Sequence, residues 1–365
     1  MIDSLTTFRF FAALGVYFHH LNYSGGLGSM GVSFFFVLSG FILSYNYYGK
    51  FLTLNTDNIL KFILYRFARV YPVHILTFII SLPIIYFSNI KFNLLDTLLN
   101  IFLLQSYFPN GNKVFSFNAV SWTISVEMVF YAFLPFILFF LYKAKIMHNI
   151  KNLFIVGSTF FLIAIIIAFM FRNEVEAFSL GWWFIYIFPL FRLVDFIIGV
   201  LLGLIFISVS NKKLFEKKDI FIFSFLEIAS ILTFVFSYYS KYYKFDSISY
   251  SLYYIPSISL IIFIFAFQRG IFSSLLSYSK LVYLGEISYS MYMIHQLAIT
   301  YFARYFFPTI YGESPDIRHN LAQTFVLLII IYSSSIIYRF YEFPLRKRIR
   351  KAADNFIREK FIDTK

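Results

Sequence analysis

The sequence predicts an all-α protein, a polytopic membrane helix bundle of about ten transmembrane helices with one extra short helix that is re-entrant or interfacial. Of its 365 residues, 60% are hydrophobic and only 13% are charged, and the mean hydropathy is +0.74. Soluble domains average about 45–50% apolar and about 25% charged residues. A soluble chain of this composition would expose more apolar surface than monomers tolerate. The 23% of aromatic residues suits a lipid-facing surface.

Ten stretches meet the requirement of about 20 mostly apolar residues for a membrane span. They are residues 6–23, 31–48, 71–88, 122–142, 152–171, 183–207, 220–238, 250–267, 284–306 and 320–341. An eleventh stretch, 94–107, is short and contains Asp96, Asn100 and Gln105. Its length predicts a re-entrant or interfacial helix rather than a span.

The placement of the 31 Lys and Arg residues favours this assignment. With ten spans and a cytoplasmic N-terminus, most of these cations fall on the cytoplasmic side, as the positive-inside rule requires. If 94–107 also spanned, every later loop would invert and most cations would lie outside. We therefore predict a transmembrane domain over 1–345, a basic cytoplasmic tail over 346–365, and both termini in the cytoplasm.

The net charge of +13 has a membrane explanation. A basic tail beside the last span contacts anionic lipid headgroups, so the lipid bilayer is the expected partner and nucleic acid is not. Zero cysteines exclude disulfides, thiol nucleophiles and Cys-ligated metals. The histidines are scattered without carboxylates at ligand spacing, so we expect no metal. We expect no cleaved signal peptide and, from the Ile, Lys, Asn and Phe usage, a bacterial inner (plasma) membrane.

Ionisable residues within spans are costly and are functional candidates by default. Arg9 and His20 share the first span, and eleven residues make about three helical turns, so both side chains lie on one face. His19 points about 100° away from His20. Helix geometry therefore favours His20 as a catalytic group. The alternative is a helix-end histidine whose ring reaches water.

Arg66 and Arg69 precede the third span, three residues apart, and Pro72 fits the first turn of that helix. Guanidinium forks suit phosphate, so this pair could hold an anionic donor from the cytoplasm. A positive-inside anchor explains the spacing equally well.

Glu127 lies about 9 Å along the fifth predicted helix from Ser121, below an interfacial Trp122. A carboxylate there serves acid–base chemistry or a structural salt bridge. Tyr292 and His295 lie on one face of a later helix, with His295 in the outer half. The expected arrangement therefore has cations at the inner side and His20, Glu127 and His295 in the outer half.

Six strings in order along the chain together resemble the acyltransferase-3 family of integral membrane acyltransferases. They are Phe8 to Leu14 with His20, Gly31 to Phe41, Arg66 to Pro72, Ser121-Trp122 with Glu127, Ser288 to Ser290 with His295, and Glu342 to Arg346. The resemblance implies transfer of an acyl group, most often acetyl, from acyl-CoA to a hydroxyl of a surface polysaccharide, glycolipid or other extracytoplasmic acceptor. It links Arg9 and His20 to activity and Arg66 and Arg69 to acyl-CoA, which is a donor substrate and not a permanently bound cofactor.

The sequence departs from the family's pattern at Phe10, where many relatives have glycine. We also expect no fused esterase-like domain, so the membrane domain alone or a separate partner protein would handle the acyl group. The hypothesis assigns catalysis to His20, Arg9, Glu127, His295 and Tyr292. The main rival is a transporter or flippase for a lipid-linked sugar, against which no two-half repeat is visible. A receptor or scaffold is a third reading.

Overall fold

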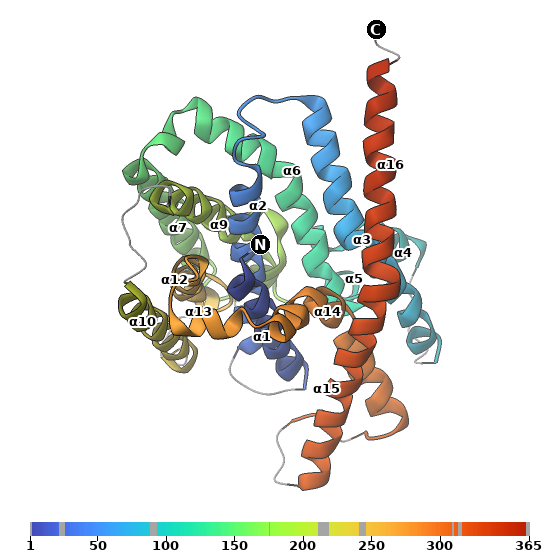
Figure 1. The fold of residues 1–365 in the computed structure, drawn as a ribbon. Helices are drawn as coiled ribbons and strands as arrows, with labels where there is room; N and C mark the ends of the chain where they lie inside the picture. Colours follow the sequence, from blue (N-terminus) through green and yellow to red (C-terminus); the bar gives the residue numbers. More distant parts are fainter. Residues whose placement is uncertain are drawn as a thin grey trace. The chain divides into compact units, whose positions relative to one another are not determined.

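The computed structural model describes residues 2–21, 26–87, 93–174, 176–210, 219–240, 246–308, 310–312 and 316–362. It is 85% helical and contains no strand in these residues (Figure 1), which confirms the predicted all-α class. The lysine-rich loop 211–218, used in predicting the orientation, and the last tail residues 363–365 lie outside the described residues.

Each of the ten predicted spans coincides with a helix. These helices are α1 (Asp3–His20), α2 (Leu27–Tyr47), α3 (Thr56–Phe87), α6 (Trp122–Lys143), α7 (Ile150–Met170), α9 (Pro189–Ser210), α10 (Ile220–Tyr239), α12 (Ile255–Ala266), α14 (Ser279–Tyr305) and α15 (Ile317–Ile337). Seven helical stretches among the described residues are long and apolar enough to cross a membrane. Of the other three, α1 and α14 are long enough but more polar, and α12 is shorter. A polytopic helical bundle is therefore confirmed.

Short helices connect the long ones. They are α4 (Leu94–Ile101), η1 (Gln105–Tyr107), α5 (Gly111–Val114), η2 (Ala119–Ser121), η3 (Ile146–His148), α8 (Leu180–Trp182), η4 (Trp183–Ile187), α11 (Asp246–Ser249), η7 (Leu252–Tyr254) and α13 (Ile271–Leu276). The predicted short helix over 94–107 corresponds to α4 and η1, each too short to span a bilayer.

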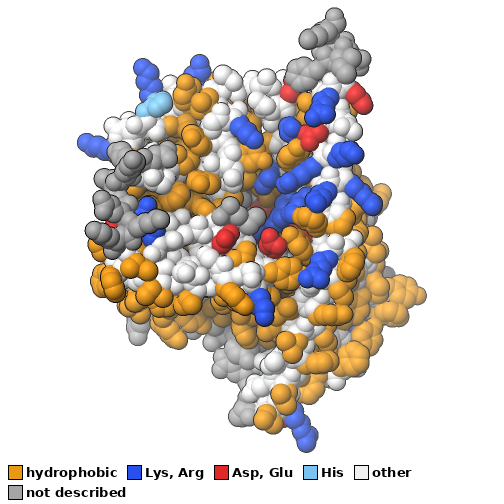
Figure 2. Space-filling view, viewed as in Figure 1, with side chains coloured by type: hydrophobic (Ala, Val, Ile, Leu, Met, Phe, Trp, Pro, Cys, Tyr) orange, Lys and Arg blue, Asp and Glu red, His pale blue; other side chains and the backbone are white. Residues whose placement is uncertain are grey.

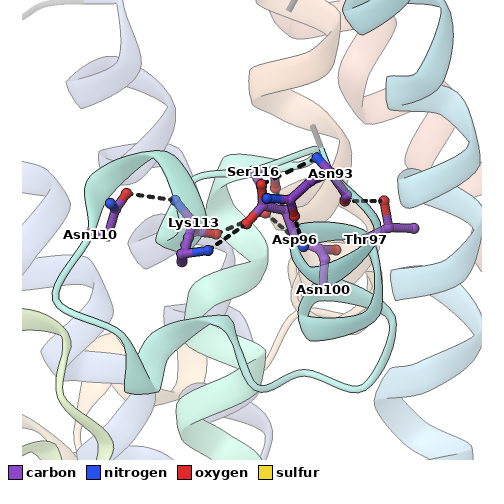
Figure 3. A network of polar contacts seen from close by, with 7 residues as sticks. All are labelled: Asn93, Asp96, Thr97, Asn100, Asn110, Lys113 and Ser116. Atoms are coloured by element: carbon purple, nitrogen blue, oxygen red, sulfur yellow. Dashed lines mark hydrogen bonds and ion pairs between the residues drawn. The ribbon is translucent and has the colours of Figure 1, made fainter. Parts of the chain in front are cut away.

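Polar contacts fold the segment from α4 to α5 back on itself (Figure 3). Asn93 caps α4 by accepting a hydrogen bond from the Asp96 amide over 2.8 Å. Lys113 pairs with the Asp96 carboxylate at 3.0 Å, and Asn100 donates to the Ser116 carbonyl over 2.9 Å. Asn100 is fully buried, so its side chain replaces backbone partners that an irregular segment lacks.

The chain divides into two compact units, one of Met1–Tyr48 and Leu141–Ser288 and the other of Gly49–Phe140 and Tyr289–Lys365. We call them unit 1 and unit 2. In unit 1, α2 packs against α9 at a crossing where glycines replace larger side chains. A Cβ atom at Gly40 would collide with the Phe196 carbonyl, and one at Gly199 with the Val37 carbonyl. Small residues at a crossing let helix backbones approach closely.

A buried ion pair lies within unit 1. Arg192 Nε is 3.1 Å from Asp195 Oδ2, one turn apart on α9, and both side chains are almost completely buried. Arg192 also donates to Ser33 Oγ over 2.9 Å and lies over the Phe36 ring at 4.9 Å. These contacts with α2 agree with a structural role for the pair.

In unit 2, α15, η8 (Tyr338–Glu342) and α16 (Phe343–Ile362) form one uninterrupted helix. At 1.5 Å per residue it is about 70 Å long, more than twice the ~30 Å hydrocarbon core of a bilayer. Its α16 part, which begins just before the predicted tail, runs beside α3 (Figure 1). The predicted end of the last span at residue 341 is wrong for the helix, which continues through the π turn of η8 and through Pro344 into α16.

Helix α3 has 32 residues and begins fifteen residues before the predicted span. Arg66 and Arg69 therefore lie in the middle of this helix, and Pro72 lies in its interior rather than in its first turn.

Candidate functional site

A charged cluster lies inside unit 2, where α3 and α6 face each other. The Tyr131 hydroxyl donates a short hydrogen bond to Glu127 Oε2, one turn earlier on α6. The same hydroxyl is within electrostatic range of Arg66 and Arg69. The Phe62 ring shows at which height along α6 this part of α3 lies. It meets the Tyr131 ring edge-on, with 6.4 Å between the ring centroids, and its centroid is 5.8 Å from the Arg66 guanidinium.

This geometry differs from the expected separation of inner arginines from an outer Glu127. The physical reason is the length of α3: its polar first half is helical and runs antiparallel to α6, so Arg66 and Arg69 reach the level of Glu127. Hydropathy predicted only the apolar second half of α3 and placed both arginines at its entry.

Glu342 of η8 is the second carboxylate of the cluster, and it is fully buried. Its Oε2 accepts a hydrogen bond from Ser290 of α14 over 2.8 Å. Its Oε1 is 3.6 Å from Arg69 and 3.9 Å from Arg346. Glu342 and Arg346, both in the last string of the family resemblance, form an ion pair, and the sequence analysis missed Arg69 and Ser290 as further partners of Glu342.

Tyr289 joins the two carboxylates into one cluster. Its hydroxyl donates to the Val70 carbonyl over 2.6 Å and is within electrostatic range of both Glu127 and Glu342. The sequence signal that could have found this cluster is the two glutamates within otherwise apolar helices. We use "charged cluster" below for the side chains of Arg66, Arg69, Glu127, Tyr131, Glu342 and Arg346.

His295 and Tyr292 lie farther along α14, with His295 about 9 Å beyond Tyr289. His295 is fully buried, and its Nδ1 is 2.6 Å from the Tyr292 carbonyl. Because a carbonyl only accepts, Nδ1 carries the proton in a neutral ring, which leaves Nε2 as the basic nitrogen. The Asn118 side chain donates to the Met293 carbonyl over 2.8 Å, so the segment that precedes α6 packs on this turn of α14.

Arg9 and His20 belong to unit 1, on α1. Both side chains are half-buried, whereas His19 is exposed with its ring against Gly28 of α2. The α1 backbone is fixed within unit 1 by Ser4, which donates to the Phe265 carbonyl over 2.8 Å, and by Thr7, which donates to the Leu276 carbonyl over 2.6 Å. A rigid α1 gives both candidate residues fixed positions within this unit.

The charged cluster combines guanidinium groups, which bind oxyanions, with carboxylates, which accept and orient protons. Among the described residues, no group of three His, Asp or Glu side chains is placed to hold a metal ion. The cluster thus has the chemistry to bind an anionic substrate and to assist proton transfer.

Sequence comparison extends this picture. A family model described as an acyltransferase domain, acyltransferase 3, matches residues 2–339. The acyltransferase MdmB of Streptomyces mycarofaciens is 35% identical over 155 residues, which is 37% of this chain and 38% of that protein. The O-acetyltransferase OatA of Staphylococcus aureus is 24% identical over 367 aligned residues, which is 96% of this chain and 58% of that protein. The match thus covers less than two thirds of either relative's length. No solved structure matches the chain.

Proposed function

Since the chain belongs to the acyltransferase-3 family, we propose that it is a multi-pass membrane O-acyltransferase that moves an acyl group, acetyl in the first place, from cytoplasmic acyl-CoA to a hydroxyl of an extracytoplasmic glycan or glycolipid. The observation that carries the proposal is the charged cluster, in which three arginines and two glutamates lie together inside helices of a membrane protein. Charges within membrane helices are costly and are functional candidates by default.

Arg66 and Arg69 are the proposed donor-binding residues. They occupy successive turns of α3, so both guanidinium groups can project from one side of the helix. Guanidinium forks bind phosphate oxygens in pairs, and coenzyme A carries phosphates that fit such a pair. The same two residues would not select the acyl chain.

In the proposed reaction, a base takes the proton of the acceptor hydroxyl, and the oxygen attacks the thioester carbonyl. The new C–O bond forms, the C–S bond breaks, and the coenzyme A thiolate leaves and takes up a proton. His20 is the proposed base or transient acyl carrier, with Arg9 on the same face of α1 about 16 Å away along the helix. Tyr292 donates to the carbonyl oxygen as its charge develops, and His295 donates with it when its Nε2 is protonated.

Glu127, which accepts a hydrogen bond from the Tyr131 hydroxyl, is proposed to orient a basic group. The acceptor lies outside the cytoplasm in this proposal, with both termini of the chain inside and the protein in a bacterial plasma membrane. The similarity to OatA, an O-acetyltransferase, supports oxygen as the acceptor atom and acetyl as the group. A separate partner protein would present the acceptor where the membrane domain does not reach it.

Proton NMR of base-labile acyl esters on surface glycan tests the proposal. Cells that lack the gene are complemented with the wild type, with His20→Ala, or with His19→Ala as the matched exposed control. We expect the ester signal with the wild type and His19→Ala only, at equal glycan amounts in all strains. Full restoration by His20→Ala would remove that residue from catalysis. Loss of the glycan itself from the surface would favour the rival transporter or flippase.

A further inference from the structure

The carboxylate of Glu342 lies between two arginines that come from different parts of unit 2. Arg69 of α3 and Arg346 of α16 are 3.6 Å and 3.9 Å from the same oxygen, Oε1. Both distances exceed the roughly 2.7–2.9 Å of a charge-assisted N–H···O hydrogen bond. Oε1 accepts no hydrogen bond from the described residues. Glu342 therefore attracts both guanidinium groups without accepting a hydrogen bond from either through Oε1. The Tyr338 side chain hydrogen-bonds to Arg346, but a guanidinium group has five N–H donors, so donors remain for another oxyanion.

The charged cluster holds three arginines against two glutamates, and the excess of positive charge is local to Glu342. Here one carboxylate faces two guanidinium groups, whose side chains are only 19% and 13% exposed. Lys and Arg side chains gather along α16 on the face seen in Figure 2. Because like charges repel most strongly where water is scarce, a bound anion would stabilise this arrangement.

Contacts farther along the same face of α16 hold it in place against α3. Asp354 accepts a hydrogen bond from Tyr65 over 2.8 Å and pairs with Lys61 at 2.6 Å. The Arg350 guanidinium lies over the Tyr65 ring at 4.9 Å. These contacts fix the register of the two helices, so the positions of Arg69 and Arg346 relative to each other do not depend on a ligand.

We propose that Arg346 is a phosphate-binding residue, and that one phosphate of the acyl donor binds between Arg346 and Arg69 with Glu342 keeping the two guanidinium groups apart. This inference rests on the proposed function, in which the donor is acyl-CoA. It gives the basic segment that begins at residue 346 a role in donor binding beyond membrane anchoring. An anionic lipid headgroup offers the same phosphate chemistry, but the half-buried position beside Ser290 and Glu342 favours the donor.

Binding measurements on the purified full chain in nanodiscs of neutral lipid test this inference. The two probes are acetyl-CoA and S-acetylpantetheine, which has the same thioester without phosphates. We expect Arg346→Ala to weaken acetyl-CoA binding about tenfold or more and to leave S-acetylpantetheine binding unchanged. Arg348→Ala removes the same charge from an exposed position on the same helix, and we expect its affinities to stay within twofold of the wild type.

Arg346→Lys keeps the positive charge but removes the bidentate guanidinium group. This variant tests phosphate binding if Arg346→Ala does not fold. We expect it to weaken acetyl-CoA binding severalfold with an unchanged unfolding temperature. Equal acetyl-CoA binding by Arg346→Lys and the wild type would overturn the inference. So would an effect of Arg346 that appears only in nanodiscs with anionic phospholipid, which would assign the site to lipid. If the wild type binds acetyl-CoA no better than S-acetylpantetheine, the proposed donor itself is wrong.

Discussion

Ser290 donates a hydrogen bond to Glu342 Oε2 over 2.8 Å, and this contact joins α14 to the long helix formed by α15, η8 and α16. Because one carboxylate oxygen is held by Ser290, the other is turned toward Arg69 and Arg346. The placement of Arg69 and Arg346 around Glu342 therefore depends on the neutral Ser290 hydroxyl. None of the contacts described above joins this hydroxyl to either arginine.

The first prediction concerns this hydroxyl. Ser290→Ala leaves Glu342 buried without its donor, and hydrogen bonds to charged groups contribute about 1.5–3 kcal/mol. We expect the KM for acetyl-CoA to rise about tenfold while kcat changes less than twofold. Steady-state kinetics check this, with Ser288→Ala as the control, because the Ser288 hydroxyl bonds only to the Gly285 carbonyl of its own helix among the contacts described. Equal KM values for the two variants would contradict the prediction.

The second prediction concerns the partner of Glu127. Tyr131→Phe keeps the buried ring and removes the hydroxyl that donates to the carboxylate. We expect kcat to fall about tenfold, since a charge-assisted hydrogen bond is lost, while the protein stays folded. Tyr301→Phe removes a hydroxyl that donates to the Ile80 carbonyl, and its kcat should match the wild type. An unchanged kcat in Tyr131→Phe would show that the mechanism does not need Tyr131 to orient the Glu127 carboxylate.

The third prediction concerns the buried ion pair of unit 1. Asp195→Ala strands the buried Arg192 guanidinium and should cost about 3–5 kcal/mol of unfolding free energy. Replacing both residues, as in Arg192→Met with Asp195→Leu, should recover most of this loss, because well-packed apolar pairs substitute for buried ion pairs. Thermal unfolding in detergent compares the three proteins. A double variant as unstable as Asp195→Ala would contradict a purely structural pair.

The fourth prediction concerns the α2–α9 crossing. Gly40→Ala places a methyl group against the Phe196 carbonyl, so the two helices must separate. Overpacking of this kind costs about 1–3 kcal/mol. Gly49→Ala meets no atom within 4 Å and should lie within about 0.5 kcal/mol of the wild type. Comparable unfolding temperatures for both variants would show that the crossing adjusts freely.

The sequence predicted the fold class and the helices well, because apolar length is the property that a bilayer selects. It located α7 and α10 to within a few residues. It missed the first fifteen residues of α3 because they contain Asp57, Lys61, Arg66 and Arg69, which lower the hydropathy without preventing a helix. It also ended the last span at residue 341, where the structure continues the helix through a π turn and Pro344.

The site was only partly predictable for a related reason. Composition and spacing identified Glu127, Arg66 and Arg69 as ionisable residues in or beside membrane spans, and therefore as functional candidates. Their proximity depends on how far α3 extends and on its antiparallel register with α6, and neither can be obtained from the residues of one helix. Nothing in the sequence identified Ser290 or Tyr131 as the partner of a carboxylate, because hydroxyl residues are common in apolar helices and become informative only beside a carboxylate.

Release of the coenzyme A thiol from acetyl-CoA tests the central claim most directly. The purified chain in nanodiscs is incubated with acetyl-CoA and with envelope glycan from the gene-deletion strain, and free thiol is measured over time. The account predicts thiol release that depends on the glycan, stops when its hydroxyls are acetylated, and falls at least tenfold in Arg69→Ala. Absence of glycan-dependent release by the wild type, with acetyl esters recovered on no acceptor, would contradict it.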